Sequence, residues 1–281
     1  MSIRRISVLD QSPVPENVDG GQALRNSIDL ARLVDSLGYH RYWVAEHHGS
    51  PGLACTAPEV LIGPIASATQ RIRVGSGGVM LPHYSPLKVA ENFSMLAGMY
   101  PDRIDLAIGR AAGTDQNTRF ALQRDRRQMA PDDFREQLDE LLGYFQPNHS
   151  TRRPFAARTI MPGRPHRPQP WLLGSSMQSA IWAAEVGLPY AFADFIYPDG
   201  AEMAAHYRQH FTPNEQLDHP TLVVAMWAIC ADDEQTAIEL SSSFRMMMTL
   251  MMRGQLIAVP SPQKAMEFLQ SDNGGALPMQ R

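Results

Sequence analysis

Short apolar runs alternate along this chain with longer amphipathic stretches, and this alternation limits the fold more than any other feature. Seven runs read as strands: 3–10, 39–47, 71–81, 103–109, 170–176, 189–195 and 221–231. Helix-like segments separate them; the segment 21–38 places Leu24, Ile28 and Ala31 at helical spacing and ends at Gly38. Strands that are apolar along their whole length and alternate with helices predict a parallel sheet covered on both faces.

The number of strand-like runs favours an α/β fold of the (β/α)8 TIM-barrel type over an open doubly wound sheet. The chain has 281 residues, and such a barrel uses about 250 residues as one domain. We find no linker-rich boundary, so we expect a single domain over 1–281. The stretch 146–169 is too long for an ordinary connection, and we interpret it as an insertion loop. No eighth apolar run follows 221–231, so one strand of the barrel is expected to be missing.

Charge and cysteine content narrow the class of protein. The net charge is −4 and the basic residues form no continuous stripe, so we expect no nucleic-acid partner. Cys55 and Cys230 are the only cysteines, which favours a reducing compartment over a disulfide scaffold. No apolar run reaches the roughly 18 residues of a membrane span, and residues 1–11 lack the apolar core of a signal peptide. We therefore expect a soluble cytoplasmic protein with no membrane partner.

The stretch WVAEHHGS ends the second predicted strand with Glu46, His47 and His48. Catalytic residues of parallel barrels lie at the C-terminal ends of strands. Neighbouring strand residues point to opposite faces, so the two histidines cannot both face the barrel mouth. Zinc needs at least about three protein ligands, and the other strand ends add only Asp10 and Asp194, so we expect no metal. A catalytic histidine and a structural one both fit the pattern.

The run LLGSS precedes a helix-like segment and suits an anion. Gly174, Ser175 and Ser176 would present free backbone N–H groups, hydroxyls and the positive end of a helix dipole to a phosphate. Arg110 follows the fourth predicted strand among small residues and supplies a guanidinium for the same anion. Ordinary N-capping by Ser175 or Ser176 is the alternative, but the two signals together favour a phosphorylated cofactor or substrate.

The third predicted strand carries an unusual run of small residues, Gly75-Ser76-Gly77-Gly78. Glycine inside a strand weakens it and often marks a bulge that a ligand approaches closely. Loose packing of small residues is the alternative interpretation. With a phosphate site elsewhere on the rim, a flat ring lying on this glycine surface is the more specific hypothesis.

These segments together resemble the bacterial luciferase-like flavin-dependent monooxygenases, and the subgroup with the LLGSS signature in particular. The resemblance covers nearly the whole chain. It rests on WVAEHHGSPGLA, on RIRVGSGGVMLPHYSPLKVAENFSMLAGMYPDRIDLAIGRAAGTD and on QPWLLGSSMQSAIWAAEVGLPYAFADF. It implies a (β/α)8 barrel. Members of the family continue with an eighth strand and a final helix, whereas this sequence ends at GGALPMQR, so both are expected to be missing here.

The resemblance also implies roles for individual residues. His47 matches the first histidine of the family's EHH motif, which lines the site where flavin and substrate react, and is our candidate acid/base. The bulge beneath the isoalloxazine, which holds a non-prolyl cis peptide in luciferase itself, corresponds to Ser76, Gly77 and Gly78. The residues matching the flavin phosphate site are Arg110, Gly174, Ser175, Ser176 and Ser179.

The implied chemistry is oxidation of a small organic substrate by a flavin C4a-hydroperoxide. FMN would arrive reduced from a separate flavin reductase, a transient partner, and react with O2 in the barrel mouth. The resemblance also implies a homodimer that uses helices beside the second and third strands. Three alternatives stay open: a flavin-binding relative without turnover, a deazaflavin-dependent oxidoreductase and, less favoured by its ligand count, a metal-dependent hydrolase.

Overall fold

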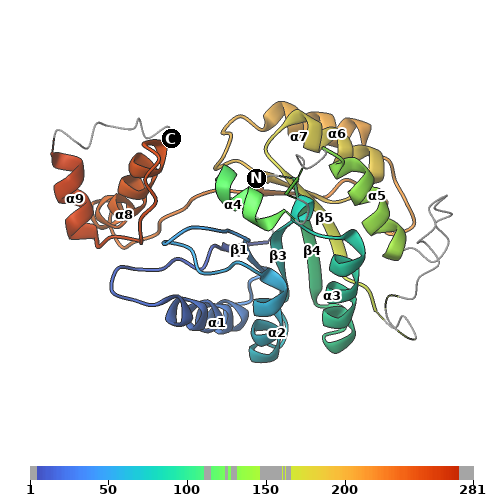
Figure 1. The fold of residues 1–281 in the computed structure, drawn as a ribbon, viewed down its shortest axis with the longest axis horizontal. Helices are drawn as coiled ribbons and strands as arrows, with labels where there is room; N and C mark the ends of the chain where they lie inside the picture. The colour runs from blue at the N-terminus through green and yellow to red at the C-terminus, as the bar shows by residue number, and fades with distance from the viewer. Residues whose placement is uncertain are drawn as a thin grey trace.

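Parallel strands form one sheet that curls into a nearly closed barrel (Figure 1). The computed structural model describes residues 5–110, 115–123, 126–127, 132–145, 160, 162 and 166–271. The strands are β1 (Ser7–Asp10), β2 (Arg41–Val44), β3 (Arg73–Met80), β4 (Ile104–Gly109), β5 (Gln169–Gly174), β6 (Tyr190–Ala193) and β7 (Leu222–Ala225). They follow one another in chain order and every neighbouring pair is parallel.

Six of the seven predicted runs contain one of these strands and the run 170–176 overlaps β5, so the prediction of a TIM-type barrel with seven strands is confirmed. In the described part of the chain, β7 and β1 are the two edges of the sheet. The predicted insertion 146–169 lies mostly outside the described residues, and the assignment of 1–281 to one domain stays a prediction.

Helices follow most of the strands and cover the outside of the sheet. They are α1 (Gly20–Ser36), α2 (Pro58–Ala68), the 3-10 turn η1 (Leu81–His83), α3 (Pro86–Met99), α4 (Gln116–Leu122), α5 (Phe134–Phe145), α6 (Met177–Val186), α7 (Ala201–His210), α8 (Glu234–Met252) and α9 (Pro262–Gln270). The first of them begins where Asp19 accepts a 2.7 Å hydrogen bond from the N–H of Gln22 and ends before Gly38, whose φ of +78° suits glycine.

Two separate cores result from the alternation of side chains along the strands. The larger core lies between the sheet and its helices and includes Tyr42, Val44 and Val74. The smaller core fills the barrel interior; its buried members, Trp43, Ala107, Trp171 and Ala191, contact Leu9, Leu173 and Val223. Residues 42 and 44 therefore face the helices, whereas residue 43 faces the barrel axis.

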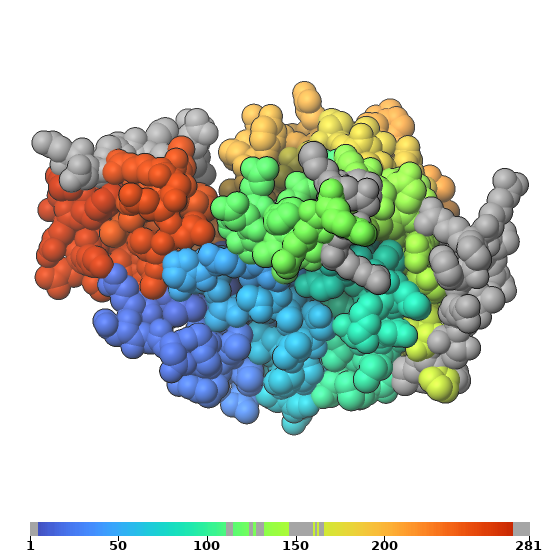
Figure 2. Space-filling model, viewed as in Figure 1, coloured from blue at the N-terminus to red at the C-terminus, as the bar shows by residue number. Residues whose placement is uncertain are grey.

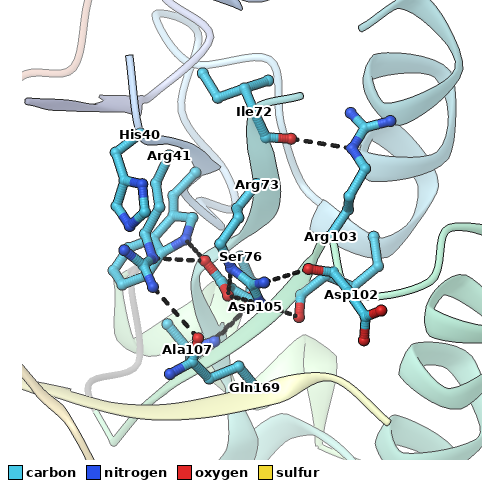
Figure 3. Close-up of polar contacts among 12 residues, drawn as sticks. His40, Arg41, Ile72, Arg73, Ser76, Asp102, Arg103, Asp105, Ala107 and Gln169 are labelled. Carbon is cyan, nitrogen blue, oxygen red and sulfur yellow. Dashed lines mark hydrogen bonds and ion pairs between the residues drawn. The ribbon is translucent and has the colours of Figure 1, made fainter. Parts of the chain in front are cut away.

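A charged network closes the N-terminal end of the barrel (Figure 3). The fully buried carboxylate of Asp105 accepts hydrogen bonds from Arg41 Nε at 2.9 Å and from Arg73 Nη2 at 2.6 Å. Arg41 also donates to the side chain of Gln169 at 3.3 Å. Buried charges are tolerated when they are paired and hydrogen-bonded in this way.

The last two helices lie to one side of the barrel (Figure 1). They have a small core of their own, formed by Met246, Leu250 and Ala265. This pair of helices contacts the N-terminal part of the chain (Figure 2), where the N–H of Val259 donates to the carbonyl of Val14 at 2.9 Å.

Among the described residues, no helix combines the length and the apolar character that crossing a bilayer requires. The cytoplasmic location stays a prediction.

Candidate active site

Small residues line the barrel at the C-terminal ends of its strands. Ala45, Gly109, Ala193 and Ala225 each follow an inward-facing residue of the interior core by two positions, so they point to the same side. Below them, Trp43 and Trp171 meet edge to face with ring centroids 5.2 Å apart. These small residues form a flat surface, the bed, at the mouth of the barrel, and the two indole rings lie beneath it.

Gly77 and Gly78 contribute the β3 part of the bed, and neither position has room for a side chain. A Cβ on Gly77 would lie 2.4 Å from Leu9 Cδ1, and one on Gly78 would lie 2.3 Å from Leu173 Cδ1. The peptide bond between the two glycines is cis, and the register with β4 shifts between Gly77 and Val79. The predicted bulge is therefore present.

Ser76 contributes to the site through its backbone, because its side chain is engaged elsewhere. The hydroxyl is fully buried; it donates to the carbonyl of Ala107 at 2.9 Å and accepts from the N–H of Ala107 at 3.0 Å. This side chain therefore ties β3 to β4 beside the bed.

His47 lies at the edge of the bed, two residues beyond Ala45, and its ring is half-buried. Its backbone N–H donates to the carbonyl of Cys55 at 3.0 Å, but its Nδ1 is buried without a hydrogen-bond partner among the described residues. Burial, and then the neighbouring charge of His48, lower the pKa of His47. A neutral imidazole with an unpartnered buried nitrogen can accept or donate a proton to a bound ligand.

Glu46 and His48 pair with each other beyond the end of β2, which lies at Val44. The Glu46 carboxylate is fully buried, and its Oε1 lies 2.7 Å from Nε2 of His48. Glu46 also accepts hydrogen bonds from the N–H of Met80 and from the hydroxyl of Tyr84, both at 2.9 Å. No pattern in the sequence indicated these last two contacts, which join residues far apart along the chain.

The serine turn of the LLGSS run forms the N-terminus of α6. Ser176 is the N-cap, and its side chain forms a capping box with Ser179, so the predicted alternative of N-capping is observed. Ser179 is buried; its hydroxyl donates to the carbonyl of Ser176 at 2.6 Å and lies 2.9 Å from the hydroxyl of Tyr190. A Cβ on Gly174 would lie 2.1 Å from Ser179 Oγ. Ser175 and Ser176 are thus the residues of this turn accessible to a ligand.

Arg110, exposed at the end of β4, lies beside the same helix. Its guanidinium lies over the ring of Trp182 of α6, 5.5 Å from the centroid. No carboxylate pairs with Arg110 in the described part of the chain. The predicted cation thus lies beside the helix that begins at the predicted serine turn, and Trp182 is a component that the sequence did not indicate.

Metal ligands do not come together in the described residues, where no group of three or more His, Cys, Asp or Glu side chains could hold an ion. Cys55 is buried, which raises the pKa of its thiol to about 12, so it is a packing residue and not a thiolate ligand.

A barrel of parallel strands with this mouth defines a class of barrel enzymes whose chemistry lies at the C-terminal ends of the strands. The luciferase-like monooxygenase family matches residues 5–275, and the chain belongs to this family. It is therefore an oxidoreductase of the flavin-dependent monooxygenase class.

Relatives support this assignment over nearly the whole chain. A luciferase-like monooxygenase of Escherichia coli strain K12 is 42% identical over 264 residues, which cover 93% of this chain and 77% of the relative. The N-acetyl-S-alkylcysteine monooxygenase of Bacillus subtilis strain 168 is 34% identical over 270 residues, which cover 95% and 80%.

Solved structures share the fold. The crystal structure of apo-MsnO8 superposes with a TM-score of 0.88 at 41% identity and covers 95% of this chain and 78% of its own. The oxygenating constituent of 3,6-diketocamphane monooxygenase from Pseudomonas putida was solved in complex with FMN. It superposes with a TM-score of 0.66 at 19% identity, over 84% of this chain and 70% of its own. At this identity the likeness shows the fold alone.

Proposed function

We propose that this chain uses reduced FMN and O2 to insert one oxygen atom into a small organic substrate. The observation that carries the proposal is His47, whose buried Nδ1 has no hydrogen-bond partner in the described part of the chain and lies beside a bed of small residues. A flat ring fits this bed because its side chains are absent or methyl-sized.

The rim fits the other end of such a cofactor. Arg110 has a guanidinium without a carboxylate partner in the described part of the chain, and the N-terminus of α6 presents Ser175 and Ser176. A phosphate suits both groups, because the helix dipole and a guanidinium each favour an anion. When bound, reduced FMN supplies the activation of O2.

The chain's own residues bind and orient the ring, exclude water and move a proton. The indole floor of Trp43 and Trp171 keeps the underside of the bed dry, because both side chains are buried. His47 holds or delivers the proton that the reaction at the ring requires, since its lowered pKa keeps the imidazole neutral at neutral pH.

Two partners belong to the proposal. A separate flavin reductase supplies reduced FMN in transient encounters. A second copy of the chain packs on the outer face of the helices α1 to α3; this homodimer is supported by exposed apolar side chains on that face, Leu33, Leu37, Val60, Met95 and Met99.

The test is incorporation of oxygen from labelled O2. The chain is incubated with FMN, NADH, a generic flavin reductase and a panel of thioethers, ketones, aldehydes and sulfonates. Product carrying label, formed by the wild type and lost in His47→Ala, supports the monooxygenase. FMN binding without labelled product from any member of the panel supports a flavin-binding relative without turnover. Replacing FMN by a deazaflavin coenzyme and following hydride transfer to or from a carbonyl tests the remaining flavin alternative.

A further inference from the structure

Glu46 is a buried carboxylate outside the bed, and it joins three parts of the mouth. Its Oε2 accepts from the N–H of Met80, at the end of β3, and its Oε1 accepts from the hydroxyl of Tyr84, just after η1. The same Oε1 pairs with His48 at 2.7 Å. The side chain of Glu46 has no exposed surface and that of His48 is only 10% exposed, so water competes little for these bonds.

The pair of Glu46 and His48 spans the backbone of His47. The three residues are consecutive, and the two flanking side chains meet each other across His47 at 2.7 Å. Rotating the backbone of His47 would separate Glu46 from His48 and would leave a buried carboxylate short of a partner. Leaving a buried charged acceptor short of a hydrogen bond destabilises the arrangement, because no water replaces the lost donor. The pair therefore fixes the direction in which the His47 ring enters the mouth.

The bond to Met80 fixes the other wall of the site. Met80 follows Gly78 by two residues, directly after the register shift between Gly77 and Val79. At such a bulge the strand ladder is disrupted locally, so the backbone there depends on other partners. Glu46 supplies such a partner for the Met80 amide.

The third partner of Glu46 is Tyr84. Its hydroxyl remains a donor because burial, and then the charge of Glu46, raise the pKa of that hydroxyl.

We infer that Glu46 is a positioning residue that sets the placement of the His47 imidazole relative to the Gly77–Gly78 bed. The inference rests on the proposed function, because it assigns a purpose to that placement: the proton-transferring ring and the flavin bed are held by the two oxygens of a single carboxylate. Glu46 does not itself touch the ring or the substrate. It acts through the backbone of His47 on one side and through the amide of Met80 on the other.

The test uses the full chain and four variants. Glu46→Gln keeps the shape of the side chain and removes its charge. His48→Leu removes one hydrogen-bond donor to Glu46, and His48→Gln restores a donor. Tyr84→Phe removes the remaining side-chain donor, which is neither next to His47 nor part of β3. The measurements are hydrogen exchange of the Met80 amide and the imidazole NMR resonances of His47, both in the ligand-free protein, and the dissociation constant for FMN.

The expected results distinguish the contact of Glu46 with His48 from its contact with the Met80 amide. Glu46→Gln speeds exchange at Met80 at least tenfold, shifts the His47 resonances and weakens FMN binding at least tenfold. His48→Leu shifts the His47 resonances without changing exchange at Met80, and His48→Gln returns them toward the wild type. Tyr84→Phe changes FMN affinity less than threefold.

Two results together would overturn the inference. The His47 resonances would keep their wild-type positions in Glu46→Gln and in His48→Leu, and the exchange rate of the Met80 amide would stay within twofold of the wild type in Glu46→Gln. Should Glu46→Gln fail to fold, the two His48 variants still decide: equal His47 resonances in His48→Leu and His48→Gln overturn it. A wild type that binds no FMN refutes the proposed function instead, and the two ligand-free measurements then judge the positioning role by themselves.

Discussion

The indole nitrogen of Trp43 donates a 2.9 Å hydrogen bond to the carboxylate of Asp105, so the floor of the mouth is tied to the charged network at the other end of the barrel. The same carboxylate pairs with Arg41 and Arg73. A single buried acid therefore orients an aromatic ring beneath the bed and pairs with two guanidinium groups. Stability and the shape of the site depend on it together.

Replacing Asp105 by asparagine should destabilise the protein strongly. The variant leaves Arg41 and Arg73 without a counter-charge, and breaking a buried pair in this way costs about 3–5 kcal/mol. Urea unfolding followed by circular dichroism measures the change. The control is Asp29→Asn, which breaks a pair with Arg32 whose side chains are 67% and 58% exposed and should cost less than about 1 kcal/mol. Equal effects of the two substitutions would refute the structural role of Asp105.

A methyl group at position 78 should damage the bed. The added Cβ would lie 2.3 Å from Leu173 Cδ1 and 2.7 Å from the carbonyl oxygen of Ala107, and the backbone oxygen cannot move aside easily. We expect Gly78→Ala to lose about 1–3 kcal/mol of stability and to weaken FMN binding. Gly63→Ala in α2, outside the bed, is the matched control, because its Cβ would have no neighbour closer than Leu96 Cδ2 at 3.8 Å. Calorimetric melting and an FMN titration of both variants check the prediction.

Removing the guanidinium of Arg110 should weaken binding of FMN but not of riboflavin. Riboflavin has the same ring without the phosphate, so the difference between the two ligands isolates the contact at the rim. A charge-assisted hydrogen bond contributes about 1.5–3 kcal/mol, which corresponds to at least about a tenfold loss of FMN affinity in Arg110→Met. Arg208→Met, on exposed α7, serves as the control. Equal losses for both ligands would show that Arg110 does not bind the phosphate.

His47 should make stability depend on pH. The folded protein lowers the pKa of His47 from its ordinary value of 6.5. Below pH 6.5 the His47 imidazole is therefore protonated more fully in the unfolded chain than in the folded protein. Stability contributed by the neutral ring is therefore present above 6.5 and is lost as the pH falls below it. The stability of His47→Gln should fall less steeply than that of the wild type in this range. Identical slopes in chemical denaturation at a series of pH values would contradict a buried neutral imidazole.

Local patterns in the sequence predicted the strands and offered N-capping by Ser175 or Ser176 as an alternative, because apolar runs and caps depend only on residues close together in the chain. The bonds of Glu46 to Met80 and of Trp43 to Asp105 join residues 34 and 62 positions apart. Such contacts depend on the register of strands around the barrel, which no short pattern encodes. For the same reason the sequence could not show that Tyr190 contacts the Ser179 hydroxyl.

The central claim, that the small-residue bed and the rim beside α6 form a flavin site, is tested most directly by anaerobic titration of the folded chain with reduced FMN, followed by the change in flavin anisotropy. The account predicts saturable binding of one FMN per chain, weakened at least tenfold by Arg110→Met and abolished by a bulky residue in Gly77→Val. Absence of saturable binding to the folded wild type, or binding that Gly77→Val leaves unchanged, would contradict it.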